Sequence, residues 1–427
     1  MQVLWLSHVV PYPPKAGVLL RAYYLLKSVA ERHAVDLVAF VQRPLLETYY
    51  PTLDEGLDDS RRTLERFCRS VTFLPIAAIE RPFGKVRTAL EGLLLEDCYM
   101  ARWLRSDAGT QVLLRLTAEH RYDLAHFDVI SLAPYRRLLP AVPATLGYHN
   151  IESHMLLRRA EKDDHLLRKL YFRQEGKRLA RYEQRVAHQF AGHITCSELD
   201  SVRLKALVPG IEPVCIPNGV DVDYFSPLRG QTKRHSLIFV STLTWYPNVD
   251  AVLFLLREIW PALKELVPDV TLDIVGAGAP PAVVELARER EGITLHGFVP
   301  DIRPLLDAAA IFVCPIRDGG GTKLKVLDAF AMAKCVVAHP IACEGIDVTD
   351  GVDVVLAKSA QEFAQRVALL LDDDQRRVEI GAAARELVVS RYAFDAIGKR
   401  LERCLCEFAA LIAPKDQRPV AVGRDSI

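Results

Sequence analysis

Several features are missing from this 427-residue chain, and each absence narrows what the protein can be. Its 54 Lys and Arg residues are balanced by 54 Asp and Glu residues, so it lacks the global positive field that nucleic-acid-binding proteins use. No apolar run reaches the roughly 18 residues that a membrane-spanning helix needs. The first residues lack a basic segment followed by a long apolar core, so we expect no secretory signal.

The cysteines show no pattern of a metal site or a disulfide framework. There are nine of them, no C-x-x-C pair occurs, and the only close pair is Cys404 and Cys406. Several, such as Cys314 and Cys335, stand inside apolar runs, where a buried thiol acts as a small hydrophobic side chain. We therefore expect a cytoplasmic protein, either soluble or held on the inner face of the membrane.

Short apolar runs alternate with longer helical patterns along the chain, which predicts βαβ units with parallel sheets. A chain of this length exceeds what one hydrophobic core covers, and the series of strands starts twice, near residues 3 and 237. We expect strands at 3–6, 35–40, 71–74, 124–127, 144–148, 193–196 and 214–216, and then at 237–240, 272–275, 293–296, 311–314, 336–338 and 352–356.

These patterns predict an α/β protein with two doubly wound, Rossmann-like domains. We place the first domain at residues 1–226 and the second at 227–395, joined by a polar, basic stretch. A helix at about 396–413 is expected to pack back on the first domain. Residues 414–427 are rich in proline and charge, with nothing to bury, so we expect a disordered tail.

The strongest chemical signal follows the expected strand at 311–314. Gly319, Gly320 and Gly321 let the backbone approach a ligand closely, and a helix opening near Thr322 would aim its N–H groups and positive dipole at that ligand. Cations follow at Lys323 and Lys325, and Asp318 precedes the loop. The segment suits a phosphate or diphosphate, although a plain glycine turn that caps a helix remains the alternative.

Other loops after expected strands give weaker signals. Asn248 stands before a helix expected to begin near residue 249, where it could bind an anion or act only as an N-cap. Gly278 lies in a Gly-Ala-Gly loop that lacks the third glycine of a dinucleotide fingerprint. In the first domain, Gly17 ends a proline-rich loop next to Arg21.

His149 directly follows the expected strand at 144–148, at the end of the sheet where α/β proteins bind ligands. Most single histidines are structural, so a functional role for His149 is about an even choice on position alone. His8, His126 and His296 also stand near strand ends. Position therefore does not single out His149.

Four segments carry patterns that recur together in one family. They are Ile-Pro-Asn-Gly-Val-Asp at 216–221 followed by Phe225, Trp-Tyr-Pro-Asn-Val-Asp at 245–250, His-Gly-Phe-Val at 296–299, and Gly-Gly-Gly-Thr-Lys-Leu-Lys-Val-Leu-Asp-Ala at 319–329. Together they resemble the family-four retaining glycosyltransferases of the GT-B fold, in the branch of bacterial surface-polysaccharide enzymes. The likeness extends to about residue 408.

The resemblance implies two Rossmann-like domains facing across a cleft, with a nucleoside-diphosphate sugar held mainly by the second. The acceptor, a glycan or a lipid-linked glycan, would be held mainly by the first. No cofactor and no metal are implied, and there is no nucleic-acid partner. The donor-binding positions that the resemblance implies, together with the loop residues above, are Gly17, Asn218, Asn248, Gly278, Phe298, Val299, Asp318, Gly319, Gly320, Gly321, Thr322, Lys325 and Asp328.

The resemblance also assigns roles and shows departures. Asp328 takes the place of the second glutamate of the family's Glu-x7-Glu motif, which binds the ribose hydroxyls. Gly320 stands at the position of the first glutamate, and Asp318 could replace it. The usual Arg and Lys after the first strand of the second domain are missing, so Lys323, supported by Lys325, is our candidate to neutralise the leaving diphosphate. His149 matches the cleft histidine, and we expect it and Lys323 to be catalytic.

Two alternative functions stay open, and one further expectation concerns the membrane. An inverting GT-B transferase or an epimerase would need a base, and His149 could serve. A degenerate homologue acting as a scaffold would explain the missing Glu, Arg and Lys. Membrane contact is expected from the basic run between Arg168 and Arg185 and from an apolar stripe, although a solvated helix face and ordinary core explain them equally well. The stripe consists of Leu90, Leu93, Leu94 and Leu104.

Overall fold

The computed structural model describes residues 1–15, 17–80, 83–84, 87–88, 98–163, 165–228, 230–319 and 321–412. The chain forms two compact units: unit 1 comprises Met1–Ile216 and the segment that begins at Gly398, and unit 2 comprises Pro217–Ile397. The division falls after Ile216, whereas the sequence placed it after residue 226. The expected tail at 414–427 lies outside the described residues, as do Leu90, Leu93 and Leu94 of the apolar stripe.

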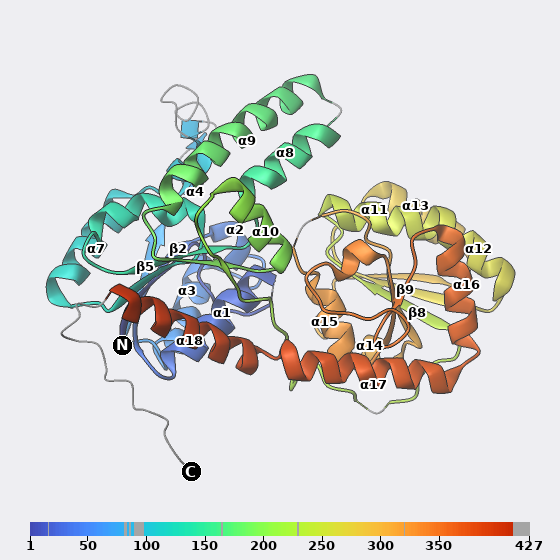
Figure 1. The fold of residues 1–427 in the computed structure, drawn as a ribbon. Helices are drawn as coiled ribbons and strands as arrows, with labels where there is room; N and C mark the ends of the chain where they lie inside the picture. Colours follow the sequence, from blue (N-terminus) through green and yellow to red (C-terminus); the bar gives the residue numbers. More distant parts are fainter. Residues whose placement is uncertain are drawn as a thin grey trace, which may run out of the picture. The chain divides into compact units, whose positions relative to one another are not determined.

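Unit 1 contains a seven-stranded sheet in the order β3-β2-β1-β4-β5-β6-β7, and every pair is parallel. Helices flank this sheet, as Figure 1 shows. The strands are β1 (Gln2–Ser7), β2 (Ala34–Val41), β3 (Ser70–Pro75), β4 (Leu124–Phe127), β5 (Ala144–Tyr148), β6 (Gly192–Thr195) and β7 (Val214–Cys215). The helices are α1 (Gly17–Ala30), α2 (Arg43–Leu46), α3 (Leu53–Leu64), α4 (Ala77–Glu80), α6 (Tyr99–Trp103), α7 (Asp107–Glu119), the 3₁₀ helix η1 (Ile130–Leu138), α8 (Glu152–Lys162), α9 (Leu166–Ala187) and α10 (Glu198–Leu207). Helix α18 (Phe394–Ile412) begins in unit 2 and belongs to unit 1 from Gly398 onward.

Unit 2 contains a six-stranded parallel sheet in the order β10-β9-β8-β11-β12-β13. Its strands are β8 (Ser236–Val240), β9 (Thr271–Val275), β10 (Ile293–Gly297), β11 (Ile311–Cys314), β12 (Cys335–Ala338) and β13 (Val355–Leu356). Its helices are α11 (Tyr246–Phe254), the π-helical turn η2 (Leu255–Ile259), α12 (Trp260–Leu266), α13 (Pro281–Glu289), α14 (Arg303–Ala308), α15 (Leu324–Ala331), the 3₁₀ helix η3 (Pro340–Cys343), α16 (Ala360–Leu371) and α17 (Asp374–Arg391).

The central strands are apolar along their length because helices cover both faces of each sheet. All four residues of β4, β11 and β12 are buried. Side-chain caps fix where several helices begin: Ser106 accepts a hydrogen bond from the Gly109 N–H, and Ser359 accepts one from the Glu362 N–H. Each expected strand has a counterpart, but residues 352–353 form a turn and Val354 forms only an isolated bridge with Asp350, so only the last two residues of the strand expected at 352–356 are strand.

Two helical segments are distinctive in how they pack. Helices α8 and α9 pack closely as a hairpin that extends beyond the sheet (Figure 1). Helix α18 packs on unit 1, where Glu402 accepts a hydrogen bond from His33 Nε2 at 3.0 Å. Among the described residues, no helix is both long and apolar enough to cross a membrane.

Candidate functional site

The loops after three neighbouring strands of unit 2 are joined at one edge of the sheet. The Ser241 N–H, after β8, donates to the Val275 carbonyl at 2.8 Å, and the Leu243 N–H donates to the Ala277 carbonyl at 2.8 Å. The Gly276 N–H, after β9, donates to the Gly297 carbonyl at 2.8 Å. These bonds fix the loops at the carboxyl ends of the strands, where α/β sheets bind ligands.

Gly276 and Gly278 are required by the closeness of these loops. Gly276 has φ 151°, and a Cβ there would lie 1.7 Å from the Ser241 carbonyl oxygen. Gly278 has φ 79°, and a Cβ there would lie 2.3 Å from Thr244 Cγ2. Both positions therefore need glycine for close packing. Close packing of the loops therefore accounts for both glycines, and a dinucleotide-binding site is not needed to explain them.

The glycine loop after β11 is anchored through Asp318. Its buried carboxylate accepts a hydrogen bond from the Gly319 N–H at 2.7 Å and one from the Tyr246 hydroxyl at 3.1 Å. Lys323 Nζ donates to the carbonyl oxygens of Gly319 at 3.1 Å and Gly321 at 2.8 Å. Gly320 lies outside the described residues. Asp318 thus holds one end of the loop, and Lys323 bridges its carbonyls.

Helix α15 begins directly after this loop, with Lys323 at the N-cap position. The first N–H groups of a helix have no partner within the helix, and the dipole places partial positive charge there. Thr322 lies between the loop and the helix, and its buried hydroxyl has no hydrogen-bond partner among the described residues. The start of α15 can therefore bind an anion, and the Thr322 hydroxyl beside it has no hydrogen-bond partner among the described residues.

Lys325 connects α15 to the loop after β8. Its Nζ lies 2.6 Å from Ser241 Oγ and 2.8 Å from Asn248 Oδ1, while Asn248 Nδ2 donates to the Thr242 carbonyl at 2.8 Å. Removal from water lowers the pKa of Lys325 to about 8. This ammonium group is therefore held in place at the strand edge.

The N-cap interpretation of Asn248 is wrong. Helix α11 begins at Tyr246, three residues earlier than the expected start near residue 249, with Trp245 at the N-cap position. Pro247 fits the first turn because its missing N–H would have no partner there. Asn248 lies inside the first turn, which leaves its side chain available to Lys325.

Asp328 stands one turn further along α15. It is half-buried, and its carboxylate makes no hydrogen bond or ion pair in the part of the chain that the structure describes. Removal from water raises the pKa of Asp328 to about 8, an effect that the charge of Lys325 opposes. A ligand that donates hydrogen bonds would therefore stabilise this carboxylate.

The remaining predicted residues of unit 2 occupy two other positions. Phe298 follows β10 and is 69% exposed, next to the half-buried Val299. Asn218 lies at the start of unit 2, and the residues that follow it pack on the segment before α18: the Val220 N–H donates to the Tyr392 carbonyl at 2.8 Å.

In unit 1, three strand ends bring His8, Asp128 and His149 together. These residues follow β1, β4 and β5, which are neighbours in the sheet. Asp128 Oδ2 lies 2.8 Å from His8 Nδ1, and Asp128 Oδ1 lies 3.0 Å from His149 Nε2. The two imidazole rings meet edge to face, with centroids 5.2 Å apart. Gly17 is also in unit 1, where it begins α1 and is exposed.

Asp128 is the centre of this cluster electrostatically. Burial acts to raise its pKa, but the charges and hydrogen bonds of His149 and His8 outweigh burial and hold the pKa of Asp128 well below its usual range. Burial lowers the pKa of His149, opposed by Asp128. An ionised Asp128 accepts an N–H from each ring, which leaves His8 Nε2 and His149 Nδ1 as the second nitrogens.

Asp128 was not among the residues predicted from the sequence, and no role was predicted for His8. The rule used for His149, a polar residue directly after a strand, also applies to Asp128 after β4, so that signal was present. His126 and His296 lie within strands, where they bond Thr145 and Asp273. The structure thus separates His149 from these two.

Two groups in the described part of the chain could hold a metal ion. One is His8, Asp128 and His149, and the other is His33, Glu402 and Cys406; within each group the ligand atoms lie within 4.8 Å of one another. In the first group the N···O distances are those of hydrogen bonds. The geometry therefore describes an Asp that orients two imidazole rings.

Comparison with known proteins adds to this geometry. Residues 234–373 match the sequence model of the family described as glycosyl transferases group 1. An uncharacterized 44.6 kDa protein in the cps region of Klebsiella pneumoniae is 23% identical over 376 residues, which cover 86% of this chain and 90% of that protein. A GDP-mannose-dependent monoacylated α-(1-6)-phosphatidylinositol monomannoside mannosyltransferase of Corynebacterium glutamicum is 28% identical over 213 residues, which cover 44% of this chain and 55% of that protein.

The crystal structure of Anabaena HepE in complex with UDP and glucose is similar in fold. Its TM-score is 0.62 at 16% identity, and the match covers 95% of this chain and all of that one. The predicted α/β fold with two Rossmann-like domains of the GT-B type is thereby confirmed. Most of unit 2, from residue 234 to 373, carries the sequence pattern of the group 1 glycosyl transferases.

Proposed function

We propose that this protein is a glycosyltransferase that moves a sugar from a nucleoside-diphosphate sugar to a glycan or lipid-linked acceptor with retention of the anomeric configuration. The observation that carries the proposal is the strand-end site of unit 2, where a glycine loop and the start of α15 lie beside two cations and an unpaired Asp328. The family match over 234–373 and the UDP and glucose in HepE support it.

The donor would bind with its diphosphate at Gly319, Gly320, Gly321 and the start of α15. Asp328 would accept hydrogen bonds from the ribose hydroxyls, which would relieve its unfavourable burial. The exposed face of Phe298, with Val299, would contact the base. The Thr322 hydroxyl would gain the partner that it lacks.

Cleavage of the anomeric bond leaves negative charge on the diphosphate. Prepositioned N–H groups and a cation stabilise that charge, by roughly 3–4 kcal/mol for one strong donor. Lys323, which bridges the loop carbonyls, would supply this cation, and Lys325 would hold Asn248 and Ser241 in place beside it. No metal is needed for this step, because the protein supplies the positive charge.

His149 would act at the reacting sugar, with Asp128 and His8 fixing its orientation. In the retaining reaction the leaving phosphate takes the acceptor's proton, so no protein nucleophile is required. The Asp128–His149 hydrogen bond also favours a second candidate, an inverting transferase or epimerase in which His149 is the base. A third candidate is a scaffold protein that has lost catalysis. The glycine at position 320, where the family has a glutamate, suggests this candidate.

A nucleotide screen tests the proposal. Thermal unfolding would be followed with UDP, GDP and ADP, since a ligand at 100 times its Kd stabilises by about 2.7 kcal/mol. Donor hydrolysis would then distinguish an enzyme from a scaffold, and NMR of the product anomer would distinguish retention from inversion. No shift with any nucleotide and no hydrolysis of any donor would refute the proposal. The Asp328→Ala variant is the matched control for binding at this site.

The biological setting is also proposed. The Klebsiella relative lies in a cps region, which supports a role in surface-polysaccharide synthesis. We propose that the protein works in the cytoplasm, at the inner face of the membrane where lipid-linked acceptors are found, and contacts the membrane through unit 1.

A further inference from the structure

Three side chains of the kinds that bind metal ions meet where α18 packs on the rest of unit 1. His33 stands in the turn between α1 and β2, and Glu402 and Cys406 stand one turn apart on α18. His33 Nε2 lies 3.0 Å from Glu402 Oε1 and 3.9 Å from Cys406 Sγ, and this Sγ lies 3.5 Å from the same Oε1. Residues from the two ends of the chain thus form a compact triangle of one nitrogen, one oxygen and one sulfur atom.

Close packing of α18 on α1 supports this triangle. Gly398 precedes Glu402 by four residues, so the two lie on one face of α18. A Cβ at Gly398 would lie 2.0 Å from Ser28 Oγ of α1, so the glycine lets the two helices approach closely. The His33 N–H donates to the Val29 carbonyl at 3.0 Å, which fixes the backbone of the turn that follows α1. Both sides of the triangle are therefore held by the packing of the two helices.

The other polar atoms of His33 and Glu402 have contacts of their own. Arg32 Nη1 donates to Glu402 Oε2 at 3.3 Å, so Oε1 is the carboxylate oxygen in the triangle. The amino nitrogen of Met1 lies 3.2 Å from His33 Nδ1, so Nε2 is the imidazole nitrogen in the triangle. Outer contacts of this kind orient the ligands of metal sites. The two side chains therefore present one nitrogen and one oxygen beside the Cys406 thiol.

The dimensions of the triangle fit one face of a zinc tetrahedron. Zn–S bonds are about 2.3 Å and Zn–N and Zn–O bonds about 2.0–2.1 Å, so ligand atoms at tetrahedral angles lie about 3.3–3.5 Å apart. The observed distances of 3.0, 3.5 and 3.9 Å reach these values with shifts of at most about 0.4 Å. A set of nitrogen, sulfur and carboxylate ligands favours Zn²⁺ over Ca²⁺ and Mg²⁺, which take oxygen ligands.

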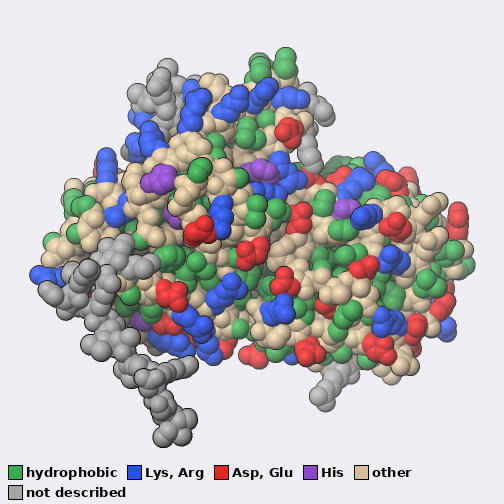
Figure 2. Space-filling view, in the orientation of Figure 1, with side chains coloured by type: hydrophobic (Ala, Val, Ile, Leu, Met, Phe, Trp, Pro, Cys, Tyr) green, Lys and Arg blue, Asp and Glu red, His purple; other side chains and the backbone are tan. Residues whose placement is uncertain are grey.

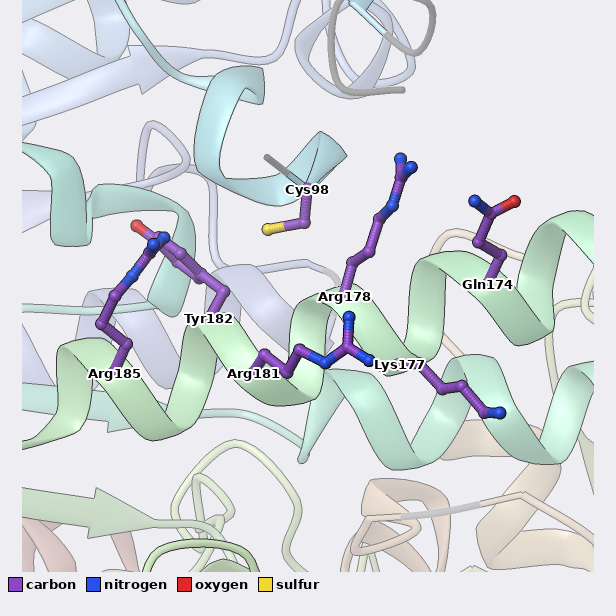
Figure 3. A pocket seen from close by; sticks show the side chains of 7 residues that line it. All are labelled: Cys98, Gln174, Lys177, Arg178, Arg181, Tyr182 and Arg185. Carbon is purple, nitrogen blue, oxygen red and sulfur yellow. The ribbon is translucent and has the colours of Figure 1, made fainter. Parts of the chain in front are cut away.

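The surroundings of Cys98 show what the α18 thiol has in addition. Cys98 is buried beside a cavity of about 510 Å³ along α9. The cavity lining includes four cations, which Figure 3 shows: Lys177, Arg178, Arg181 and Arg185. Figure 2 shows further Lys and Arg side chains along the α8–α9 hairpin. The described lining contains neither a histidine nor a carboxylate, so this thiol lacks a ligand set and the nearby charges repel a metal cation.

Cys406 differs from Cys98 in access as well as in neighbours. All nine cysteines are among the described residues, and Cys406 is the one that is not buried. The side chain of Glu402 is 16% exposed and that of His33 is 9% exposed. An ion can therefore reach the triangle from solvent, and a water molecule can complete its coordination.

We propose that His33, Glu402 and Cys406 bind one Zn²⁺ ion, with water as the fourth ligand, and that this ion fastens α18 to the turn between α1 and β2. On binding, the imidazole coordinates in its neutral form and the thiol proton passes to solvent. His33 precedes β2, so the site lies at the amino ends of the strands, at the opposite edge of the sheet from His149. The ion is therefore structural, and its site is independent of the proposed sugar transfer.

Calorimetry with ZnCl₂ on the full chain, after removal of metals with a chelator, tests the proposal. We expect one ion per chain. Loss of an outer contact costs about 10- to 100-fold in metal affinity, so Cys406→Ser, His33→Gln and Glu402→Gln should each lose at least about 100-fold, and Arg32→Gln about tenfold. The matched control Cys404→Ala removes a buried thiol from the same helix and should keep the affinity of the wild type.

Two further measurements test the thiolate ligand and the fastening of α18. Co²⁺ in place of Zn²⁺ should give a sulfur-to-metal charge-transfer band in the wild type and in Cys404→Ala, and no such band in Cys406→Ser. Saturating Zn²⁺ should raise the midpoint of thermal unfolding in the wild type and in Cys404→Ala, because the ion binds the folded chain, and should leave that of Cys406→Ser unchanged.

Three results would overturn the inference. A folded wild-type chain that binds no Zn²⁺ would mean that His33 and Glu402 form only an ion pair. Equal Zn²⁺ affinity in the wild type and Cys406→Ser, or Co²⁺ binding without the charge-transfer band, would place the ion elsewhere. Zn²⁺ binding that leaves thermal unfolding of the wild type unchanged would exclude the fastening of α18.

Discussion

The polar clusters at the strand ends of the two units are built in opposite ways. In unit 1, Asp128 uses both carboxylate oxygens, one for His8 and one for His149. In unit 2, Asp328 has no hydrogen-bond partner in the described chain, and the buried hydroxyl of Thr322 has none either. The pKa values differ accordingly: that of Asp128 is held well below its usual range, and that of Asp328 is raised to about 8.

This contrast indicates a different role for each cluster. A buried polar group without a partner costs about 1–3 kcal/mol, and a ligand that supplies the partner recovers that cost on binding. A ligand with hydroxyl and phosphate groups should therefore stabilise unit 2 more than unit 1. The cluster of unit 1 is already satisfied, so its contribution is a fixed orientation of His149. Mutations in the two units should accordingly affect different measured quantities.

The largest expected effect is at Lys323. If its ammonium group neutralises the leaving diphosphate, Lys323→Ala should lower turnover on the order of 10²-fold or more, because the transition state loses a charge partner. Steady-state kinetics with the donor found by the nucleotide screen would measure it.

Two controls sharpen this test. Lys358 is an exposed lysine of unit 2, so Lys358→Ala removes the same charge without touching the loop and should keep full activity. Lys325→Ala should also reduce turnover, because Asn248 and Ser241 lose their cation. Full activity of a folded Lys323→Ala enzyme, with a large loss in Lys325→Ala, would transfer the role to Lys325.

In unit 1, Asp128→Asn should lower kcat by about 10- to 10²-fold and leave UDP affinity unchanged. An amide can accept from only one ring and must offer its N–H₂ to the other, so one histidine is forced into the wrong tautomer. Calorimetry with UDP and steady-state kinetics separate the two readouts. A comparable loss of UDP affinity would contradict the division of roles between the units.

Much of the fold was predictable, since buried parallel strands are short apolar runs with clear ends. The prediction at 352–356 failed in its first part because Val352 is 53% exposed in a turn, and an exposed valine in a short segment looks like a strand residue. The boundary between the units, after Ile216, could not be predicted from the sequence either. Residues 217–226 are joined to unit 2 by contacts from distant residues, such as Arg385 with the Phe225 carbonyl at 3.2 Å.

Ligands of α/β sheets bind after the carboxyl ends of the strands, and this rule identified the loops of the unit 2 site. It did not predict which side chains of these loops form hydrogen bonds with one another. Whether Lys323 or Lys325 reaches Asn248 depends on where α15 and α11 begin, and the start of α11 was misplaced by three residues. In unit 1, the order β1-β4-β5 brings His8, Asp128 and His149 together. A single sequence does not display sheet order, so Asp128 stayed unnoticed.

A smaller effect is expected at Asp328. Asp328→Ala should weaken UDP binding about tenfold, or about 1.4 kcal/mol, by removing the acceptor for the ribose hydroxyls. Asp328→Asn keeps one acceptor oxygen and should fall between the wild type and the alanine variant. Calorimetry with UDP measures both. Unchanged affinity would reduce Asp328 to an acidic residue within a helix.

The smallest effect, and the most specific, is at Thr322. Its buried hydroxyl lacks a partner among the described residues, so Thr322→Val removes an unsatisfied group while keeping the side-chain shape. The ligand-free protein should gain about 1 kcal/mol in the free energy of unfolding, because the cost of burying the hydroxyl disappears. UDP affinity should fall about fivefold, because a hydrogen bond formed only with the ligand is lost. Denaturant unfolding and calorimetry would test the two signs together. A variant that is less stable without ligand would mean that the hydroxyl has a hydrogen-bond partner in the free protein. Unchanged UDP affinity would mean that the nucleotide does not reach the hydroxyl. Either result would weaken the contrast between the unpaired polar groups of unit 2 and the hydrogen-bonded cluster of unit 1.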